Sequence, residues 1–308
     1  MRNIFINSAN EDWIADRFKS EWEKYNSEGY NFTNLKNADY IWILSPWMWK
    51  KIPKRYLKKK KVICTIHHID EEKFDANEEK DFMFRDQYVD KYHITTKKTL
   101  YKLKQLTKKE IIQIPFWVNQ NLWFEIEDKL QLRKKYGLDK EGYYIGSFQR
   151  DTEGNDLSSP KLSKGPDRFI EIINHLNEKK ENLHIILSGK RRQFVINNLE
   201  KLGINYTYFE MSSFTELNEL YNILDLYIVA SRVEGGPQSI PECALTRTQI
   251  ISTDVGVASN ILSPESIFKM DNFIKAKPNT EIAYQNVQKY LIPHGFKEFN
   301  ENLFDDEN

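Results

Sequence analysis

Two glutamates frame a glycine-containing segment, Glu234-Gly-Gly-Pro-Gln-Ser-Ile-Pro-Glu242. It follows the apolar run Leu224 to Val229, so it lies where a predicted strand ends and a helix begins. Adjacent glycines let the backbone approach a ligand closely, and the amides at a helix start receive an anion or a hydroxyl well. Carboxylates accept hydrogen bonds from sugar and ribose hydroxyls. The segment is therefore a candidate ligand-binding loop.

Both glutamates also have structural interpretations. Ser239-Ile-Pro-Glu242 has the spacing of a capping box, in which serine is the N-cap, proline takes an early helical position and glutamate reaches back from N3. Glu234 could instead open a surface turn, because the Gly-Gly-Pro stretch that follows it at a strand end has turn-forming residues. For Glu242 the two roles, cap and ligand contact, are compatible.

Short β-rich runs alternate with helical patterns along the chain, which is typical of parallel sheets with crossover helices. The predicted class is α/β, with two Rossmann-like parallel-sheet domains that face each other across a cleft. Residues 1–118 form the first domain and residues 119–282 the second, and a last helix over about 283–308 is expected to pack back on the first. Ligands of such sheets bind beyond the carboxyl ends of the strands.

The predicted elements are short runs of apolar residues. The strands of the first domain are Ile4 to Ile6, Ile41 to Leu44, Val62 to Ile66, Tyr92 to Thr95 and Ile111 to Ile114, with a helix over Ile14 to Tyr25. The strands of the second are Tyr143 to Phe148, Leu183 to Leu187, Tyr206 to Phe209, Leu224 to Val229, Gln249 to Ser252 and Ile267 to Met270. Its helices are Leu130 to Tyr136, Phe169 to Leu176, Phe194 to Leu202, Leu217 to Leu224 and one that opens at Pro241.

Several loops at these strand ends carry a resemblance that covers most of the chain. Glu234 and Glu242 stand in the Glu-x7-Glu pattern of retaining glycosyltransferases of the GT-B fold, and the chain resembles glycosyltransferase family four, the group 1 glycosyltransferases. Four further motifs occur in the family's order: Thr65-Ile-His-His68, Gly146-Ser-Phe-Gln-Arg150, Lys164-Gly165 and Thr253-Asp254-Val-Gly256.

The resemblance implies a donor site in the second domain. Glu234 would hold hydroxyls of the transferred sugar and Glu242 the ribose, while Arg150 and Lys164 would neutralise the diphosphate. His67 would face the donor sugar from the first domain. The remaining donor-binding residues would be the loop Gly235, Gly236, Pro237, Gln238 and Ser239, and, around the base, Ser188, Gly189, Lys190, Phe209, Glu210 and Met211.

The implied reaction is retaining transfer of a sugar from a UDP- or GDP-sugar to a hydroxyl of a glycan or lipid-linked glycan. No cofactor and no metal would be required, because the cationic side chains supply the positive field. Two alternatives stay open: a sugar-nucleotide epimerase or hydrolase on the same fold, and a binding or scaffold protein without catalysis.

The chain departs from the family in two places. Residues 151–163 separate Arg150 from Lys164, so Lys161 competes for the lysine's role, and the sequence leaves open whether this insert closes over the donor. The first strand is followed by Asn7-Ser-Ala-Asn10 in place of a glycine pair. Asn7, Ser8, Ala9, Asn10 and His68 are the candidates for the acceptor side, whereas His93 is expected to be structural.

Charge and composition limit the classes of partner that are expected. The 45 basic and 45 acidic residues balance, and no nucleic-acid-binding motif is present, so nucleic acid is not an expected partner. The basic run from Lys50 to Lys61 is either a solvated face or a contact with an anionic membrane. Cys64 and Cys243 are expected to be buried thiols. The first residues lack an apolar stretch of signal-peptide length, so a cytoplasmic protein, peripheral at most to the inner membrane face, is expected.

Overall fold

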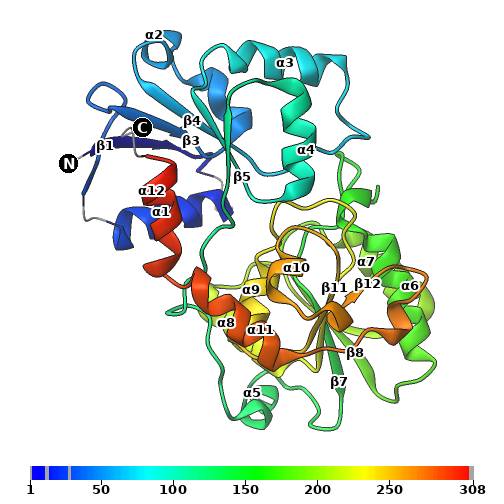
Figure 1. The fold of residues 1–308 in the computed structure, drawn as a ribbon. Helices are drawn as coiled ribbons and strands as arrows, with labels where there is room; N and C mark the ends of the chain where they lie inside the picture. The colour runs from blue at the N-terminus through cyan, green and yellow to red at the C-terminus, as the bar shows by residue number, and fades with distance from the viewer. Residues whose placement is uncertain (1, 11–13, 27–28, 305–308) are drawn as a thin grey trace. The chain divides into compact units, whose positions relative to one another are not determined.

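The computed structural model describes residues 2–10, 14–26 and 29–304. The chain divides into two compact units, the first made of Met1–Trp117 and Tyr290–Asn308 and the second of Val118–Lys289 (Figure 1). The backbone therefore enters the second unit once and returns to the first for its last residues. None of the helices in residues 2–10, 14–26 and 29–304 has the length and hydrophobicity of a membrane span.

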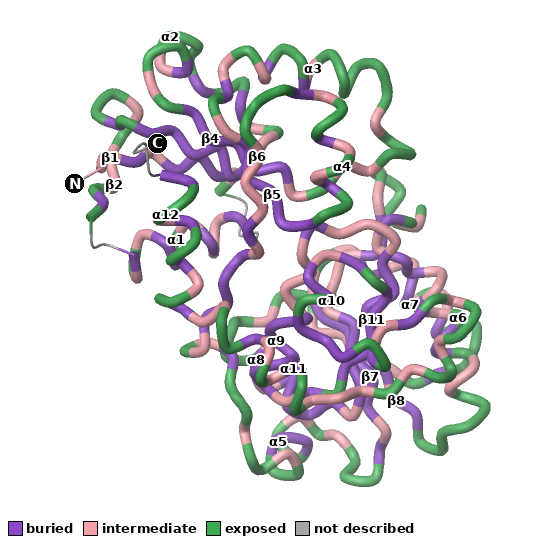
Figure 2. Tube along the Cα trace, viewed as in Figure 1, coloured by how far each residue is buried: buried purple, intermediate pink, exposed green. Residues whose placement is uncertain are grey.

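The first unit is built on a six-stranded sheet in which all neighbouring strands are parallel, in the order β2-β1-β3-β4-β5-β6. Its core strands are buried on both faces, as expected for parallel strands covered by helices (Figure 2). The strands are β1 (Arg2–Asn7), β2 (Tyr30–Phe32), β3 (Tyr40–Ile43), β4 (Lys61–Ile66), β5 (Lys91–Ile94) and β6 (Glu110–Gln113). The helices are α1 (Ile14–Tyr25), α2 (Lys54–Leu57), α3 (Ala76–Asp86), α4 (Lys97–Leu106) and α12 (Lys297–Asn302), with 3-10 turns η1 (Pro46–Lys51) and η6 (His294–Phe296).

An aromatic core joins the two ends of the chain in this unit. The ring of Trp22 on α1 lies 5.2 Å from that of Phe296 and 5.8 Å from that of Phe299, so the returning segment completes the core (Figure 1). The prediction of one helix over 283–308 is wrong: α11 (Thr280–Val287) belongs to the second unit and α12 to the first. Pro293, which cannot continue a helix, stands between them.

The second unit repeats the design with a six-stranded parallel sheet in the order β12-β11-β10-β7-β8-β9. Its strands are β7 (Tyr143–Ser147), β8 (Leu183–Ser188), β9 (Asn205–Phe209), β10 (Leu226–Val229), β11 (Ile250–Thr253) and β12 (Ile267–Phe268). Its other helices are α5 (Lys129–Lys135), α6 (Pro166–Asn177), α7 (Gln193–Leu202), α8 (Phe214–Ile223), α9 (Ser239–Leu245) and α10 (Ala258–Ile261), and its 3-10 turns include η2 (Leu162–Lys164). The predicted class, α/β with two Rossmann-like parallel sheets, is confirmed.

Some predicted boundaries need correction. The helix predicted over Leu217 to Leu224 begins earlier, because Ser213 and Glu216 form a capping box that opens α8. The strand predicted from Leu224 begins at Leu226, because Leu224 is the C-cap of α8. The two cysteines are buried free thiols, as predicted, and burial raises the pKa of Cys64 to about 11.

His93 is the structural histidine that the sequence predicts. Its Nε2–H donates to the carbonyl oxygen of Ile114 at 2.8 Å, and its Nδ1 lies 3.0 Å from the hydroxyl of Thr65, which also accepts from the Trp42 indole at 2.9 Å. Complete burial lowers the pKa of His93 to about 3, with a smaller contribution from His67 against the opposing hydrogen bond to Ile114. The folded protein therefore holds the His93 ring in its neutral form.

This pKa predicts an acid instability of the first unit. Because the folded-state pKa of about 3 lies below the ordinary value of 6.5, the unfolded chain binds the proton more readily. The stabilisation is complete above pH 6.5 and is lost as pH falls toward 3, by up to about 5 kcal/mol. Denaturant unfolding at a series of pH values measures this effect. As the pH falls, the free energy of unfolding should decrease more steeply for the wild type than for His93→Gln. Parallel curves for the two proteins would contradict the assignment.

Candidate functional site

The second unit has a topological switch point between β7 and β10. From β7 the chain continues to β8 on one side, whereas β10 continues to β11 on the other, and β7 and β10 are themselves paired. The two loops that leave the carboxyl ends of these strands therefore diverge, and this is where open α/β sheets bind ligands. Both loops carry motifs singled out in the sequence, the stretch to Arg150 and the segment from Glu234.

A charged pair lies at this point. The Nζ of Lys164 donates to Oε2 of Glu234 at 2.5 Å, and the hydroxyl of Ser231 donates to Oε1 at 3.1 Å. The Glu234 side chain is 7% exposed and that of Lys164 is 23% exposed. Both carboxylate oxygens are thus engaged, which fixes the orientation of Glu234. Lys164 has three N–H donors, so its ammonium can serve the carboxylate and an additional acceptor together.

The backbone of η2 is pressed against the end of β10. Gly165 has a φ of 64°, and a Cβ at this position would lie 2.0 Å from the carbonyl oxygen of Ala230. The Lys164 carbonyl accepts from the Gln149 side-chain amide at 2.9 Å. Only glycine fits this approach, and the approach is what brings the Lys164 side chain to Glu234.

The insert 151–163 folds back on itself, so it does not separate its two ends. The amide of Lys161 donates to the Asp151 carbonyl at 2.8 Å, and the amide of Glu153 to the Ser159 carbonyl at 3.0 Å. The insert returns the chain beside the place where it left, immediately before η2. Lys161 is the N-cap residue of η2. The two ends of the insert are thus held together by the bond between Lys161 and Asp151.

Arg150 lies on the insert side of the site. Its Nε donates to the Thr152 carbonyl at 2.7 Å, and burial together with the charge of Arg191 lowers its pKa. Within the described part of the chain it forms no hydrogen bond or ion pair with Lys164 or Glu234. Among the described residues, the structure therefore brings Lys164 and Glu234 together and shows no direct contact of Arg150 with either.

A buried ion pair that sequence reasoning missed anchors the insert. The Nε of Arg192 lies 2.9 Å from Oδ2 of Asp151, and its Nη1 donates to the carbonyls of Ser147 at 2.6 Å and Ser188 at 3.2 Å. Burial raises the pKa of Asp151, and the Arg192 guanidinium opposes this rise. The pair ties the ends of β7 and β8 to the insert. Its partners lie 41 residues apart, and no local sequence pattern marks either.

The glycine loop after β10 is held by the end of β11. Gly256 has a φ of 58°, and a Cβ there would lie 2.4 Å from Cδ of Pro237 and 2.7 Å from Cα of Gly236. The Thr253 hydroxyl donates to the Ser231 carbonyl at 2.7 Å. The motif Thr253 to Gly256 thus supports the loop from Gly235 to Gln238.

Glu242 is not part of a capping box. Helix α9 begins at Ser239 with Gln238 as N-cap, so Ser239 lies inside the first turn and does not cap the helix with its side chain. The Glu242 side chain is buried, and its Oε2 accepts from the Tyr221 hydroxyl at 2.7 Å. The capping-box prediction is therefore wrong, and the structural role of Glu242 is to hold Tyr221.

The residues predicted around a base lie on two neighbouring loops. Ser188 ends β8 and is followed by Gly189 and Lys190, and Phe209 ends the paired strand β9 and is followed by Glu210 and Met211. The Gly189 amide donates to the Phe209 carbonyl at 3.2 Å, so the loops are joined. Sequence reasoning did not identify Phe148, Tyr221 and Tyr227, whose rings lie 4.9 to 5.5 Å apart next to Glu242.

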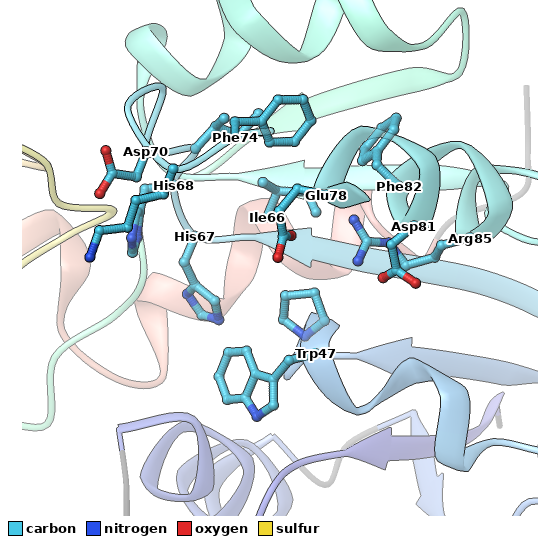
Figure 3. Close-up of a pocket in the computed structure, with 13 residues that line it drawn as sticks. Trp47, Ile66, His67, His68, Asp70, Phe74, Glu78, Asp81, Phe82 and Arg85 are labelled. Atoms are coloured by element: carbon cyan, nitrogen blue, oxygen red, sulfur yellow. The ribbon is translucent and has the colours of Figure 1, made fainter. Parts of the chain in front are cut away.

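The predicted residues of the first unit occupy separate strand ends. The His67 Nε2–H donates to the Leu44 carbonyl at 2.9 Å, and its ring stacks on Phe116 at 5.9 Å. His67 and His68 line a pocket of this unit (Figure 3). Asn7 is the last residue of β1, and Ser8, Ala9 and Asn10 follow it; the Asn10 backbone amide donates to Asp16 at 2.9 Å. Their acceptor-side role stays a prediction.

The basic run from Lys50 to Lys61 is divided among several partners. Lys50 pairs with Asp81, the Lys60 ammonium donates to the Lys36 carbonyl at 3.3 Å, and Lys54 lies 4.6 Å from the centre of the Phe84 ring. Lys54, Arg55, Lys58 and Lys59 are exposed. The run is thus partly a solvated face.

Comparisons with known proteins agree with the predicted resemblance. Residues 157–291 match the family "Glycosyl transferases group 1". Over 143 residues the chain is 23% identical to the lipopolysaccharide core biosynthesis mannosyltransferase LpsB of Rhizobium meliloti (strain 1021), a match that covers 44% of this chain and 38% of that protein.

Solved structures share the fold over the whole chain. Anabaena Alr3699/HepE in complex with UDP-glucose has a TM-score of 0.73 at 12% identity, with 98% of this chain and 99% of that chain covered. The lipopolysaccharide outer core galactosyltransferase WaaB has a TM-score of 0.65 at 13% identity, with 99% of each chain covered. The resemblance to GT-B glycosyltransferases is confirmed.

The approach at Gly165 can be tested with a matched pair of substitutions. Gly165→Ala and Gly203→Ala both place a side chain at positive φ, which costs roughly 1–2 kcal/mol. Only Gly165→Ala also meets a backbone atom, whereas nothing lies within 4 Å of the added Cβ at Gly203. In denaturant unfolding of the second unit, Gly165→Ala should therefore lower the free energy of unfolding more than Gly203→Ala does. Equal losses would mean that the contact with Ala230 does not constrain the site.

Proposed function

We propose that this chain is a retaining glycosyltransferase that moves a sugar from a nucleoside-diphosphate sugar to a hydroxyl of a glycan or lipid-linked glycan. The observation that carries the proposal is the pair of Lys164 and Glu234 at the switch point of the second unit. Both residues lie in the segment that matches the group 1 glycosyltransferases. A fixed carboxylate beside an ammonium suits a ligand that presents a hydroxyl next to a phosphate.

The two side chains would have different tasks. Glu234 would accept hydrogen bonds from hydroxyls of the transferred sugar, and Lys164 would donate to the diphosphate. Negative charge grows on the diphosphate as the glycosidic bond breaks, so the ammonium stabilises the transition state more than the ground state. Arg150 would add positive charge from the insert side, and the loop from Gly235 to Ser239 would enclose the sugar and phosphates.

The anchoring of Glu234 favours a binding role over that of a proton acceptor. Its two oxygens already accept from Lys164 and Ser231, so neither is free of a donor. In the proposed reaction the acceptor hydroxyl attacks the face that the diphosphate leaves, and a phosphate oxygen takes its proton. Lys164 and Arg150 supply the neutralising charge, so the proposal assigns no role to a metal.

The remaining predicted residues complete the proposal. Glu242 would hold the ribose through the carboxylate that also accepts from Tyr221, and the joined loops after β8 and β9 would contact the base. His67 is proposed to contact the transferred sugar. The relatives favour substrates of the same kind, because LpsB is named as a mannosyltransferase of lipopolysaccharide core biosynthesis and HepE was crystallised with UDP-glucose.

Substitution of the charged pair tests the proposal. Lys164→Met and Glu234→Gln should each lower the rate of transfer by roughly 10²–10³, because each removes an interaction that strengthens in the transition state. Lys179→Met and Glu178→Gln are matched controls at exposed positions just after α6 and should leave the rate unchanged. Mass spectrometry of products from UDP- and GDP-sugars with glycan acceptors gives the rate, and NMR gives the anomeric configuration.

Each of the other possible outcomes would support a different function or reject the site. Full transfer by both pair variants would reject the site. Donor consumed without an acceptor product would indicate the epimerase or hydrolase, and donor bound without turnover under any acceptor would indicate a binding protein. Inversion at the anomeric carbon would contradict the retaining mechanism while leaving the site intact.

We also propose that the exposed part of the basic run contacts an anionic membrane when the acceptor is lipid-linked. Each lysine or arginine near such a surface contributes about 1 kcal/mol. Arg55→Glu with Lys58→Glu should therefore reduce sedimentation with phosphatidylglycerol vesicles, whereas Lys179→Glu with Lys180→Glu in the second unit should not. Equal sedimentation of all three proteins would leave the run as a solvated face.

A further inference from the structure

A pocket of about 420 Å³ opens beside the end of β4 in the first unit. Its walls come from η1, from the loop after β4 and from α3 (Figure 3). Trp47 and His67 lie on one side, with ring centres 6.4 Å apart, and Arg85 and Asp81 line it from α3. Every residue that lines the pocket belongs to this unit.

Arg85 is an anomaly in this pocket. The residue is only 8% exposed, and its Nε has no hydrogen-bond partner. Across the described ranges, its guanidinium makes no hydrogen bond or ion pair with another side chain or with the backbone. The ring of Phe82 lies 5.3 Å below it but offers no acceptor for its N–H groups. A buried charge without an acceptor is destabilising, so the fold keeps it against a cost.

The carboxylate that could have paired with Arg85 has other partners. Oδ1 of Asp81 pairs with the ammonium of Lys50, and its Oδ2 accepts from the indole of Trp49 at 3.1 Å. The pKa of Asp81 is lowered, because these hydrogen bonds and nearby positive charges outweigh the opposing effect of burial. Both oxygens of Asp81 thus bond to η1, while Arg85 lines the pocket.

The rest of the lining fits a sugar ring. Trp47 is 49% exposed and presents a flat apolar surface, on which a sugar ring stacks well. Asp70 and Glu78 also line the pocket and are good acceptors for hydroxyl groups. These two carboxylates would repel an anion that entered beside them, so the negative group must be placed at Arg85, with Lys73 as the second cation of the lining.

We propose that this pocket binds a sugar that carries an anionic group, with the carboxylate or phosphate on Arg85 and the ring on Trp47. A guanidinium offers paired donors that match the oxygens of either group. The identification of this sugar as a unit of the acceptor rests on the proposed function. Recognition of the anion does not, because it depends only on residues of the first unit.

Binding of free sugars to the full chain tests the proposal. In titrations followed by NMR, glucuronate or glucose 6-phosphate should bind at least ~10-fold more tightly than glucose, since a charge-assisted pair replaces a neutral contact. Arg85→Met should abolish this preference. The matched control Arg55→Met, which removes an exposed arginine of α2, should keep it. Whichever of the two anionic sugars binds more tightly shows whether the pocket prefers a carboxylate or a phosphate.

The melting temperature separates ligand binding from a structural role. Because Arg85 has no hydrogen bond or ion pair among the described residues, Arg85→Met should melt at the same temperature as the wild type or higher. A lower melting temperature together with an unchanged preference for anionic sugars would overturn the proposal. So would equal binding of all three sugars by the wild type.

A second variant and a second ligand keep the result interpretable. Trp47→Ala removes an exposed ring, so the variant should fold normally and should bind all three sugars more weakly, by a similar factor. Binding of UDP- and GDP-sugars is measured in parallel and should be unaffected by either variant. Loss of nucleotide-sugar binding in the wild type would reject the proposed function, whereas loss of the Arg85-dependent preference alone would reject the present inference.

Discussion

The approach of η2 to the end of β10 is the constraint on which the proposed site depends. Gly165 lies so close to the carbonyl of Ala230 that no side chain fits there, and this contact sets the position of the preceding residue, Lys164. The ammonium then reaches Glu234, whose second oxygen is held by Ser231. One backbone contact between segments 65 residues apart thus places a fixed carboxylate and a cation together, beyond the sheet where its strand order reverses.

The rest of the second unit supports that arrangement from two sides. On one side, the buried pair of Asp151 and Arg192 holds the insert to the ends of β7 and β8, so a long polar segment does not displace η2. On the other, the tight contact between Gly256 and Pro237 fixes the glycine loop. The first unit uses the same sheet design but completes its core with the last part of the chain, through Phe296 and Phe299.

The sequence predicted the features whose signals are local. The alternating strands and helices gave the fold class, and the motifs at Glu234, Lys164 and Thr253 lie where strand ends meet, because carboxyl ends of parallel strands share one edge of a sheet. Features that depend on distant partners were missed. Arg192 and Arg85 look like ordinary surface arginines in sequence. Only the fold shows that Arg192 is buried in an ion pair and that Arg85 is buried with no hydrogen bond or ion pair among the described residues. The spacing of Ser239 and Glu242 matched a capping box. In the structure the helix begins at Ser239 itself, so the Ser239 side chain does not cap it.

The central claim is that Lys164 and Glu234 hold the diphosphate and the sugar of a nucleotide sugar. A crystal structure of the full chain with an intact UDP- or GDP-sugar tests it most directly. The account predicts a diphosphate oxygen within hydrogen-bond distance of Lys164 Nζ and a sugar hydroxyl donating to Glu234, with the backbone at Gly165 unchanged. A nucleotide sugar bound with its diphosphate away from Lys164, and the Lys164–Glu234 pair undisturbed, would contradict the account.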